Sequence, residues 1–265
     1  MTTSRLTAKR ETASFIILGS GTSTGVPMVG CGCRVCTSDD PHDKRTRASV
    51  LIRHDDRSIL IDTSPDLRQQ ALREGITGID AVLFTHSHAD HVNGIDDLRG
   101  FHFMHHQVIP CFAAQPTLDI LLNRFCYIFE EQNGSGYTPL LAPHLITGEV
   151  EIGNLKVIPI PLQHGNTTSI GYRIGNFAYL TDCNAIPHAA FLLLRGIEIV
   201  IIDGLRWNPH ATHFNIETAI AAAQQLDPKR IVLTHLSHDV SFSDGEKLPQ
   251  GVEFAYDGME FQLDV

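Results

Sequence analysis

The sequence contains no apolar run that approaches the roughly 20 residues that a membrane-spanning helix needs. Its first apolar stretch, Phe15–Leu18, stops at a glycine-rich turn. No low-complexity linker divides the chain, and no internal repeat of fixed period is present. With 265 residues, of which 43% are hydrophobic, the chain is long enough to bury a substantial core. We therefore expect one large domain over residues 14–265, with neither a membrane span nor a secretory signal.

The N-terminal residues MTTSRLTAKRET are polar and show no periodicity. We expect residues 1–13 to form a disordered tail. The tail is mildly basic, but it lacks the amphipathic stripe of an organelle-targeting peptide. A cytoplasmic location is therefore expected.

Positive charge is also scarce in this chain. The net charge is −10, whereas a protein that binds long nucleic acids usually carries a basic surface that releases condensed counterions. A small substrate is therefore favoured, and a nucleic acid polymer is not expected as a partner. The local basic group of Lys44, Arg45 and Arg47 is interpreted as a solvated loop in preference to a phosphate site.

The six cysteines are unevenly distributed. Cys31, Cys33 and Cys36 crowd into one loop, which favours a metal site over disulfides in a chain of cytosolic character. The other three stand singly in apolar surroundings and are expected to be small buried side chains without a role: Cys111, Cys126 and Cys183.

Short apolar segments and helical patterns alternate along the chain, which indicates a layered α/β fold. Nine segments are predicted to be strands: Phe15–Leu18, Ser49–Arg53, Ser58–Ile61, Ala81–Phe84, Lys156–Pro159, Gly171–Ile174, Phe177–Leu180, Ile197–Ile202 and Ile231–Leu233. Five are predicted to be helices: Ser64–Glu74, Val92–His102, Thr117–Glu131, Pro187–Leu194 and Asn215–Leu226. The segment from about Gly100 to Pro143 is the least regular, and its stretch QNGSGYTP is interpreted as a loop. The segment could act as a lid or an interface element.

The stretch THSHADH, residues 85–91, follows the apolar strand AVLF directly. His86, His88, Asp90 and His91 all have side chains that can bind a metal. In an extended loop His86 and His88 point to the same side, whereas Asp90 and His91 enter a helix and turn toward a neighbouring point. A single histidine is more often an ordinary polar side chain, but four potential ligands within six residues predict two metal ions.

The pattern H-x-H-x-D-H resembles the signature of the metallo-β-lactamase superfamily. The resemblance implies an αββα sandwich, in which two mixed β-sheets are flanked by helices. It also implies seven ligands, since further candidates follow the strands KVIPIPLQ, FAYLT and RIVLT. His86, His88 and His164 would hold one divalent ion, Asp90, His91 and His235 would hold the other, and Asp182 would bridge them. Such ligands suit zinc, manganese or iron, so the ligand type does not settle the metal.

Asp62 closes the strand SILI and matches an early aspartate of the superfamily. The resemblance implies that it hydrogen-bonds within the site and orients a ligand without binding a metal. A helix cap before Pro65 is the alternative interpretation.

The order LGSGTSTGVPMVGCGCRVC, THSHADH and LTHLSH resembles a narrower group, the PhnP-like cyclic phosphodiesterases, from about Phe15 to Met259 and including a YDGME segment. The three thiolates are one ligand short of a closed tetrahedral zinc site, and His238 could complete it. In that family these cysteines and the last histidine bind a structural zinc. The GSGTSTGVP segment lacks the lysine of a P-loop and is interpreted as a tight turn at the rim of the active site.

The same resemblance implies hydrolysis of a small phosphodiester by a hydroxide that bridges the two ions. The phosphodiester could be cyclic. Asp90 and Asp182 would act in catalysis as ligands. His213 would contact the phosphate and protonate the leaving oxygen, whereas His210 is expected to be exposed. The family also suggests a homodimer.

Three alternatives differ in class. The tRNA 3′-processing endonuclease branch shares the ligand set, but this chain has no long, basic, glycine-rich insertion. Hydrolysis of lactams, lactones or thioesters is less favoured because of the CxCxxC motif. A non-catalytic binding module, as in cofactor biosynthesis, could lose ligands without penalty, whereas all seven positions are filled here.

Overall fold

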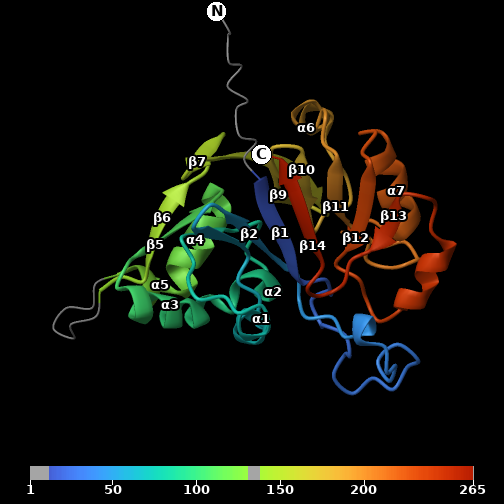
Figure 1. Cartoon of the computed structure of the whole chain (residues 1–265), viewed down its shortest axis with the longest axis horizontal. Coiled ribbons are helices and arrows are strands. Elements are labelled where there is room, and N and C mark those ends of the chain that lie inside the picture. Colours follow the sequence, from blue (N-terminus) through green and yellow to red (C-terminus); the bar gives the residue numbers. More distant parts are fainter. Residues whose placement is uncertain (1–11, 131–137, 265) are drawn as a thin grey trace, which may run out of the picture.

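Two β-sheets form the centre of the molecule (Figure 1). The computed structural model describes residues 12–130 and 138–264, and within them each sheet has seven strands. The first sheet contains, in spatial order, β14 (Glu260–Asp264), β1 (Thr12–Gly19), β2 (Ser49–His54), β3 (Arg57–Ile61), β4 (Ala81–Leu83), β5 (Ile109–Ala113) and β6 (Leu141–Leu145). The second contains β13 (Val252–Phe254), β12 (Arg230–Thr234), β11 (Ile199–Asp203), β10 (Phe177–Leu180), β9 (Thr167–Ile174), β8 (Leu155–His164) and β7 (Val150–Ile152).

Helices cover the outer face of each sheet. Those over the first sheet are α1 (Leu67–Arg73), α2 (Ala89–Val92), α3 (Leu98–His105), α4 (Gln115–Arg124) and α5 (Cys126–Phe129). Those over the second are α6 (His188–Leu193) and α7 (Ile216–Gln224). Three short 3-10 helices occupy Pro41–Asp43, Ile95–Asp97 and Phe242–Lys247. Both sheets mix parallel and antiparallel pairs, so the predicted αββα sandwich is confirmed.

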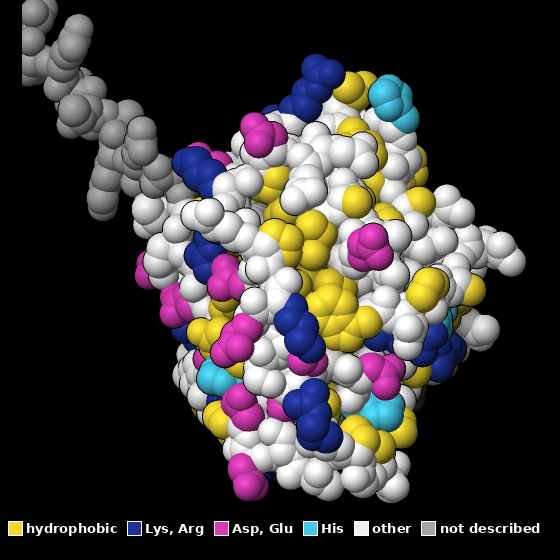
Figure 2. Space-filling model, turned by 90° about the vertical axis from the view of Figure 1, so that its right-hand side faces the viewer, with side chains coloured by type: hydrophobic (Ala, Val, Ile, Leu, Met, Phe, Trp, Pro, Cys, Tyr) yellow, Lys and Arg dark blue, Asp and Glu magenta, His cyan; other side chains and the backbone are white. Residues whose placement is uncertain are grey.

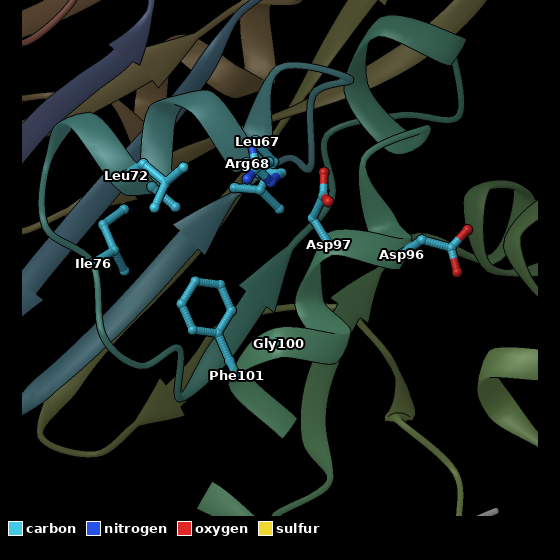
Figure 3. A pocket seen from close by; sticks show the side chains of 9 residues that line it. Leu67, Arg68, Leu72, Ile76, Asp96, Asp97, Gly100 and Phe101 are labelled. Carbon is cyan, nitrogen blue, oxygen red and sulfur yellow. The ribbon is translucent and has the colours of Figure 1, made fainter. Parts of the chain in front are cut away.

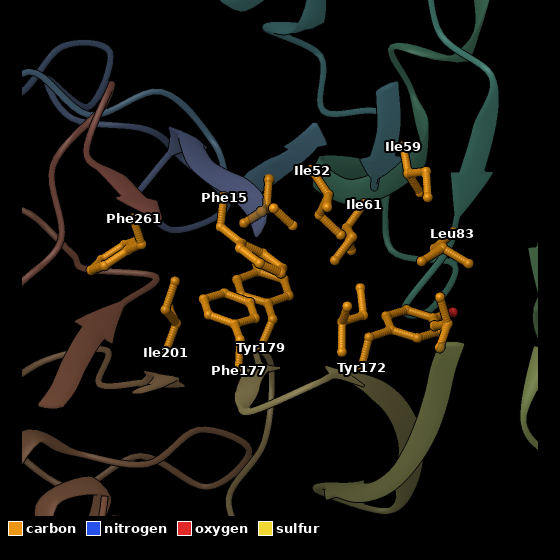
Figure 4. Packing of buried hydrophobic residues seen from close by; sticks show 14 of the residues in the cluster. Phe15, Ile52, Ile59, Ile61, Leu83, Tyr172, Phe177, Tyr179, Ile201 and Phe261 are labelled. Atoms are coloured by element: carbon orange, nitrogen blue, oxygen red, sulfur yellow. The ribbon is translucent and has the colours of Figure 1, made fainter. Parts of the chain in front are cut away.

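The core lies between the two sheets (Figure 4). Successive side chains of a strand point to opposite faces, so Phe15 and Ile17 of β1 face the second sheet while Ile16 and Leu18 face the helices. The ring of Phe15 stacks on that of Phe177 from β10, with 3.9 Å between the ring centroids. Burial on both faces explains why these strands are continuous apolar runs in the sequence.

The nine predicted strands are all present, and so are helices in the five predicted places. Val92–His102 is divided, because the chain forms α2, a 3-10 turn and then α3. Within Gly100–Pro143 the described residues form β5, α4 and α5, so this part of the segment is more regular than expected. The predicted loop QNGSGYTP lies mostly outside the described residues.

Three further expectations change at the level of single residues. Strand β1 begins at Thr12, so Thr12 and the buried Ala13 belong to the sheet, while residues 1–11 lie outside the described part. Arg45 is buried and not solvated, because its guanidinium donates to Asp43 (3.2 Å) and to the Val240 carbonyl (2.8 Å). Cys126 is exposed, whereas Cys111 and Cys183 are buried as expected.

The two ends of the described chain meet at one edge of the first sheet. Thr12 pairs with Asp264 in the antiparallel β1–β14 ladder. This end of β1 is opposite to Gly19, from which the chain continues toward the ligand-bearing strand ends (Figure 1). No helix in the described residues is long and apolar enough to cross a membrane.

Candidate metal centre

The ends of strands from both sheets converge on one edge of the sandwich. His86 follows β4, His164 is the last residue of β8, Asp182 lies just beyond β10, and His235 follows β12 directly. Asp90 and His91 lie in α2, the short helix after the β4 loop. Rigid strands thus present the side chains, as a site of fixed geometry requires.

One group of donors comprises His86, His88, His164 and Asp182, whose ligand atoms all lie within 4.8 Å of one another. The Oδ2 atom of Asp182 is 3.7 Å from Nε2 of His86 and 3.9 Å from Nε2 of His164. Nε2 of His164 is 3.4 Å from Nδ1 of His88. His86 and His88 therefore face the same point, as predicted from the extended loop.

The second group comprises Asp90, His91, His235 and again Asp182, within the same limit of 4.8 Å. Here the Oδ1 atom of Asp182 is 3.1 Å from Nε2 of His91 and 3.3 Å from Nε2 of His235. The Oδ2 atom of Asp90 lies 3.3 Å and 3.6 Å from the same two nitrogens. Each oxygen of Asp182 thus faces a different group, which is the arrangement of a bridging ligand.

These residues fit two divalent cations. The Nε2 atoms of His86, His91 and His235 are buried and have no hydrogen-bond partner among the described residues. Leaving several buried polar atoms unsatisfied is costly, so such atoms indicate a ligand. Donors bound tetrahedrally at about 2.0–2.1 Å lie roughly 3.3 Å apart, which matches the spacing within the second group.

The electrostatics of the site favour cations as well. Burial alone would lower the pKa of His91, but the carboxylates of Asp182, Asp62 and Asp90 raise it well above the ordinary value. Burial likewise disfavours charge on His235, yet the neighbouring carboxylates, Asp182 first, raise its pKa to about 9. The carboxylates therefore create a negative potential, which bound cations would neutralise in place of protons.

Partners on the far side of three histidine rings orient them toward the centre. Nδ1 of His91 lies 2.7 Å from Oδ2 of Asp62, whose two oxygens also accept hydrogen bonds from the amide and hydroxyl of Thr85. Nδ1 of His86 lies 3.0 Å from the Thr85 hydroxyl, and Nδ1 of His164 donates to the Thr212 carbonyl at 2.8 Å. The contacts of Asp62 match the predicted orienting role. The alternative interpretation, in which Asp62 caps a helix, does not hold, because the residue at the N-terminal cap of α1 is Asp66.

The backbone adopts uncommon conformations at these positions. Asp62, Asp182 and His235 have φ angles of 62°, 52° and 59°. Such left-handed conformations are unfavourable for residues with a side chain and cluster at functional sites. Here they turn the side chains inward just after a strand ends.

His213 lies beside the second group of donors. Its ring stacks on that of His235, with 4.8 Å between centroids, and its Nδ1 is 2.6 Å from Oδ2 of Asp203. Asp203 is fully buried at the end of β11 and also accepts a hydrogen bond from the amide of Cys183. Asp203 is not among the predicted site residues, although its position at the end of an apolar strand resembles those of Asp62 and Asp182. His210 is exposed, as expected.

A cavity of about 450 Å³ opens onto these side chains. Its lining residues are Ser23, His88, Asp90, His164, Asn166, Thr167, Asp182, Thr212, His213 and His235. No lysine or arginine is among them. A separate hollow of about 300 Å³ between α1 and α3 is lined by residues such as Leu72, Ile76 and Phe101 and contains none of the predicted ligands (Figure 3).

The cysteine cluster forms a second candidate site. Cys31, Cys33, Cys36 and His238 place their ligand atoms within 4.8 Å of one another, and Nδ1 of His238 is 3.4 Å from the sulfurs of both Cys31 and Cys33. The amide of Cys36, with help from His238, lowers the pKa of Cys33 to about 6. A thiolate is the form that binds zinc, so three sulfurs and one imidazole suit a structural zinc ion. All six cysteines are free of disulfides.

Cys33→Ser is expected to release one metal ion per chain and to lower the melting temperature by at least about 5 °C, since 1 kcal/mol corresponds to about 2–4 °C in a domain of this size. Elemental analysis and thermal unfolding would check this. Cys126→Ser, a change at an exposed cysteine, is the matched control and should alter neither quantity. An unchanged melting temperature and metal content in Cys33→Ser would contradict the structural role.

Comparison with known proteins places this geometry in a family. The beta-lactamase superfamily domain matches residues 57–236, more than half of the chain. A solved structure described as a new diphosphatase from the PhnP family is 41% identical, with a TM-score of 0.89, and the match covers 96% of this chain and 98% of that one.

Two curated relatives have other names. An octanoyltransferase from Porphyromonas gingivalis is 44% identical over 255 residues, which cover 94% of this chain but 51% of that protein, so this chain spans about half of its length. A coenzyme PQQ synthesis protein B from Xanthomonas axonopodis pv. citri is 26% identical over 94% of this chain and 99% of that protein. The family model and the near full-length match to the diphosphatase agree: the chain belongs to the PhnP family of the metallo-β-lactamase superfamily.

Proposed function

We propose that this protein is a dinuclear metal-dependent hydrolase of small phosphodiesters. The observation that carries the proposal is the position of Asp182, whose two oxygens face two separate groups of donors, all of them buried except His88. Both groups and His213 open onto one cavity. The 41% identity to a PhnP-family diphosphatase supports hydrolysis at phosphorus.

Two divalent cations held by these residues would lower the pKa of water to about 7 and neutralise charge on phosphoryl oxygens. The contribution of the chain is geometric. Asp182 fixes the separation of the two groups, and Asp62 and Thr85 fix the orientation of His91 and His86. Because the donors are positioned before substrate arrives, little reorganisation is needed during reaction.

His213 is the candidate proton donor. Its Nδ1 is held by Asp203 at 2.6 Å, so its Nε2 is the ring nitrogen that remains to hold a proton for the leaving oxygen. The buried carboxylate of Asp203 fixes the orientation of the ring. His213 thus belongs to the reacting site without being one of the seven predicted metal ligands.

The cavity favours a small substrate. Its volume of about 450 Å³ is of the size that small-molecule sites have. On the face shown in Figure 2, Lys and Arg side chains are interspersed with Asp and Glu and do not form a basic band. This distribution, with the net charge of −10, argues against a nucleic acid polymer as substrate.

The names of the curated relatives do not favour other chemistry. No cysteine or lysine among the described residues lines the cavity, so it offers no side chain of the kinds that carry acyl groups through a thioester or an amide. The filled ligand set likewise favours catalysis over a binding module.

A substrate panel tests the proposal. The protein reconstituted with Zn²⁺ or Mn²⁺ should cleave bis(p-nitrophenyl) phosphate, cyclic nucleotides, cyclic sugar phosphates or diesters of diphosphate, and should act poorly on p-nitrophenyl phosphate. In each good substrate the attacked phosphorus carries one negative charge, whereas a monoester carries nearly two near neutral pH and repels an attacking oxygen anion more strongly. Rapid processing of tRNA precursors with negligible turnover of all small diesters would overturn the proposal.

Asp182→Ala should lower kcat by more than the 10- to 100-fold that loss of an orienting residue costs. Without the shared carboxylate the two cations repel each other, and nothing fixes the distance between them. The variant should also retain fewer metal ions per chain. Asp62→Asn is the comparison, since it removes an orienting acceptor but no ligand, and should fall within that 10- to 100-fold range. Equal effects of the two variants on kcat and metal content would count against a bridging role.

His213→Ala should slow turnover by about 10²-fold or more for diesters with alkyl leaving groups. It should slow p-nitrophenyl diesters less, because a good leaving group needs little protonation. Asp203→Asn should show the same dependence on leaving group in weaker form, and the exposed neighbour His210→Ala should not. A His213→Ala effect that is uniform across leaving groups would exclude proton donation.

A further inference from the structure

His235 differs from the other buried histidine ligands in how it is held. The rings of His86, His91 and His164 each have a partner on Nδ1. Nδ1 of His235 is buried but has no hydrogen-bond partner in the described part of the chain. Because no hydrogen bond from the described residues holds Nδ1, the ring depends on its stacking against His213 and on the backbone that carries it.

That backbone is fixed by a segment from the other end of the chain. The amide of Leu236, which follows His235, donates to the Ser20 carbonyl at 2.9 Å, and the amide of Thr22 donates to the Leu236 carbonyl at 3.2 Å. On its other side the amide of Gly21 donates to the Thr46 carbonyl at 2.8 Å. We call Ser20, Gly21 and Thr22 the seam, because they connect β12 of one sheet to the β2 side of the other.

The seam requires glycine at its centre. A Cβ added at Gly21 would lie 2.9 Å from the Arg45 carbonyl oxygen and 3.0 Å from that of Thr46. Both contacts are backbone atoms that cannot move aside easily. The glycines of the GSGTSTG motif thus permit close approach of strands, which explains the motif without a phosphate.

The carboxylate of Asp257 binds the seam through hydrogen bonds. Its Oδ1 atom accepts hydrogen bonds from the amide of Ser20 at 2.9 Å and from its hydroxyl at 2.8 Å. Its Oδ2 atom accepts from the amide of Thr46 at 2.9 Å, from its hydroxyl at 2.5 Å and from Arg73 at 3.2 Å. The side chain is 8% exposed, so this carboxylate is almost wholly committed to the two segments that flank Gly21.

The seam also leads into the cavity. The residue that follows it, Ser23, lines the cavity within a turn closed by the hydrogen bond from the Gly25 amide to the Thr22 carbonyl, 2.8 Å long. A shift of the seam would therefore move both His235 and the cavity wall.

We propose that Asp257 is a positioning residue of the metal centre, which acts through the seam to hold the backbone of His235 and, with it, the cation bound by Asp90, His91 and His235. The effect on turnover rests on the proposed phosphodiesterase function. The effect on cation binding does not.

The test is Asp257→Asn, which keeps one oxygen for Ser20 but replaces the other acceptor by an amide nitrogen that cannot accept from Thr46. One cation of the pair should bind about 10- to 100-fold more weakly, the range for residues that orient ligands, while the structural zinc is retained. Competition with a chelator followed by elemental analysis measures this without any substrate. The absorption spectrum of the Co²⁺-loaded protein should change as well.

Asp80→Asn is the matched control. Asp80 accepts a hydrogen bond from the Ser58 amide at 2.8 Å, at the opposite end of the first sheet. The Asp80→Asn substitution therefore makes the same chemical change far from the seam. It should leave cation binding unaltered. If Asp257→Asn lowered only the melting temperature, with wild-type cation affinity and Co²⁺ spectrum, the residue would be structural and the proposal overturned.

A double-mutant cycle locates the effect. In a His235→Ala background, Asp257→Asn should weaken cation binding no further, because the ligand through which it acts is absent. An additive loss would show that Asp257 acts elsewhere and would also overturn the proposal. Ser20→Ala, which removes only the hydroxyl contact, offers a milder variant should Asp257→Asn fold poorly.

Discussion

The carboxylate of Asp182 is shared between two groups of imidazoles, and much of the surrounding structure is organised to keep it there. A buried carboxylate is costly unless it is paired with positive charge or hydrogen bonds. Here its two oxygens lie 3.1–3.9 Å from the Nε2 atoms of four histidines. Those histidines come from both sheets, so the packing of the two sheets sets the geometry of the site.

The inter-sheet core explains how this geometry can be held. Phe15, Tyr172 and Phe177 fill the space between the sheets with large rings, and a close-packed interior resists small displacements. The hydroxyl of Tyr172 also donates to the Phe84 carbonyl at 2.7 Å, directly before the THSHADH loop. The hydrophobic core and the polar site are therefore mechanically connected.

The sequence predicts the ligand positions well because they follow a local rule, in which an apolar strand ends and a metal-binding side chain follows. Five strands of the described part were not predicted: β5, β6, β7, β13 and β14. Of these, IPCFA and LAPHL contain proline, and VEI and VEF have only three residues, which weakens the strand pattern. The burial of Arg45 was missed for another reason. One of its acceptors, the Val240 carbonyl, lies 195 residues away in the sequence, so no local pattern indicates it.

Asp203 and Asp257 show the same limit within the site itself. Asp203 ends an ordinary apolar strand and Asp257 stands in the YDGME segment, but in neither case does the local sequence show which groups the fold brings to the carboxylate. Asp203 contacts His213, which is ten residues away in the sequence, whereas Asp257 accepts a hydrogen bond from Ser20, which is 237 residues away. Short motifs identify atoms that bind cations, but the residues that hold those atoms in place become visible only with tertiary structure.

The pairing of Thr12 with Asp264 has a consequence for the architecture of longer proteins. Both ends of the described chain leave the sandwich together, at the end of β1 opposite to Gly19 and to the candidate metal centre. A module fused at either end would therefore be attached at the same corner of the sandwich and would leave the entrance of the cavity accessible. By the same geometry a short linker could join the two ends, so that new termini placed in an exposed loop would give a circularly permuted protein with its candidate metal centre undisturbed.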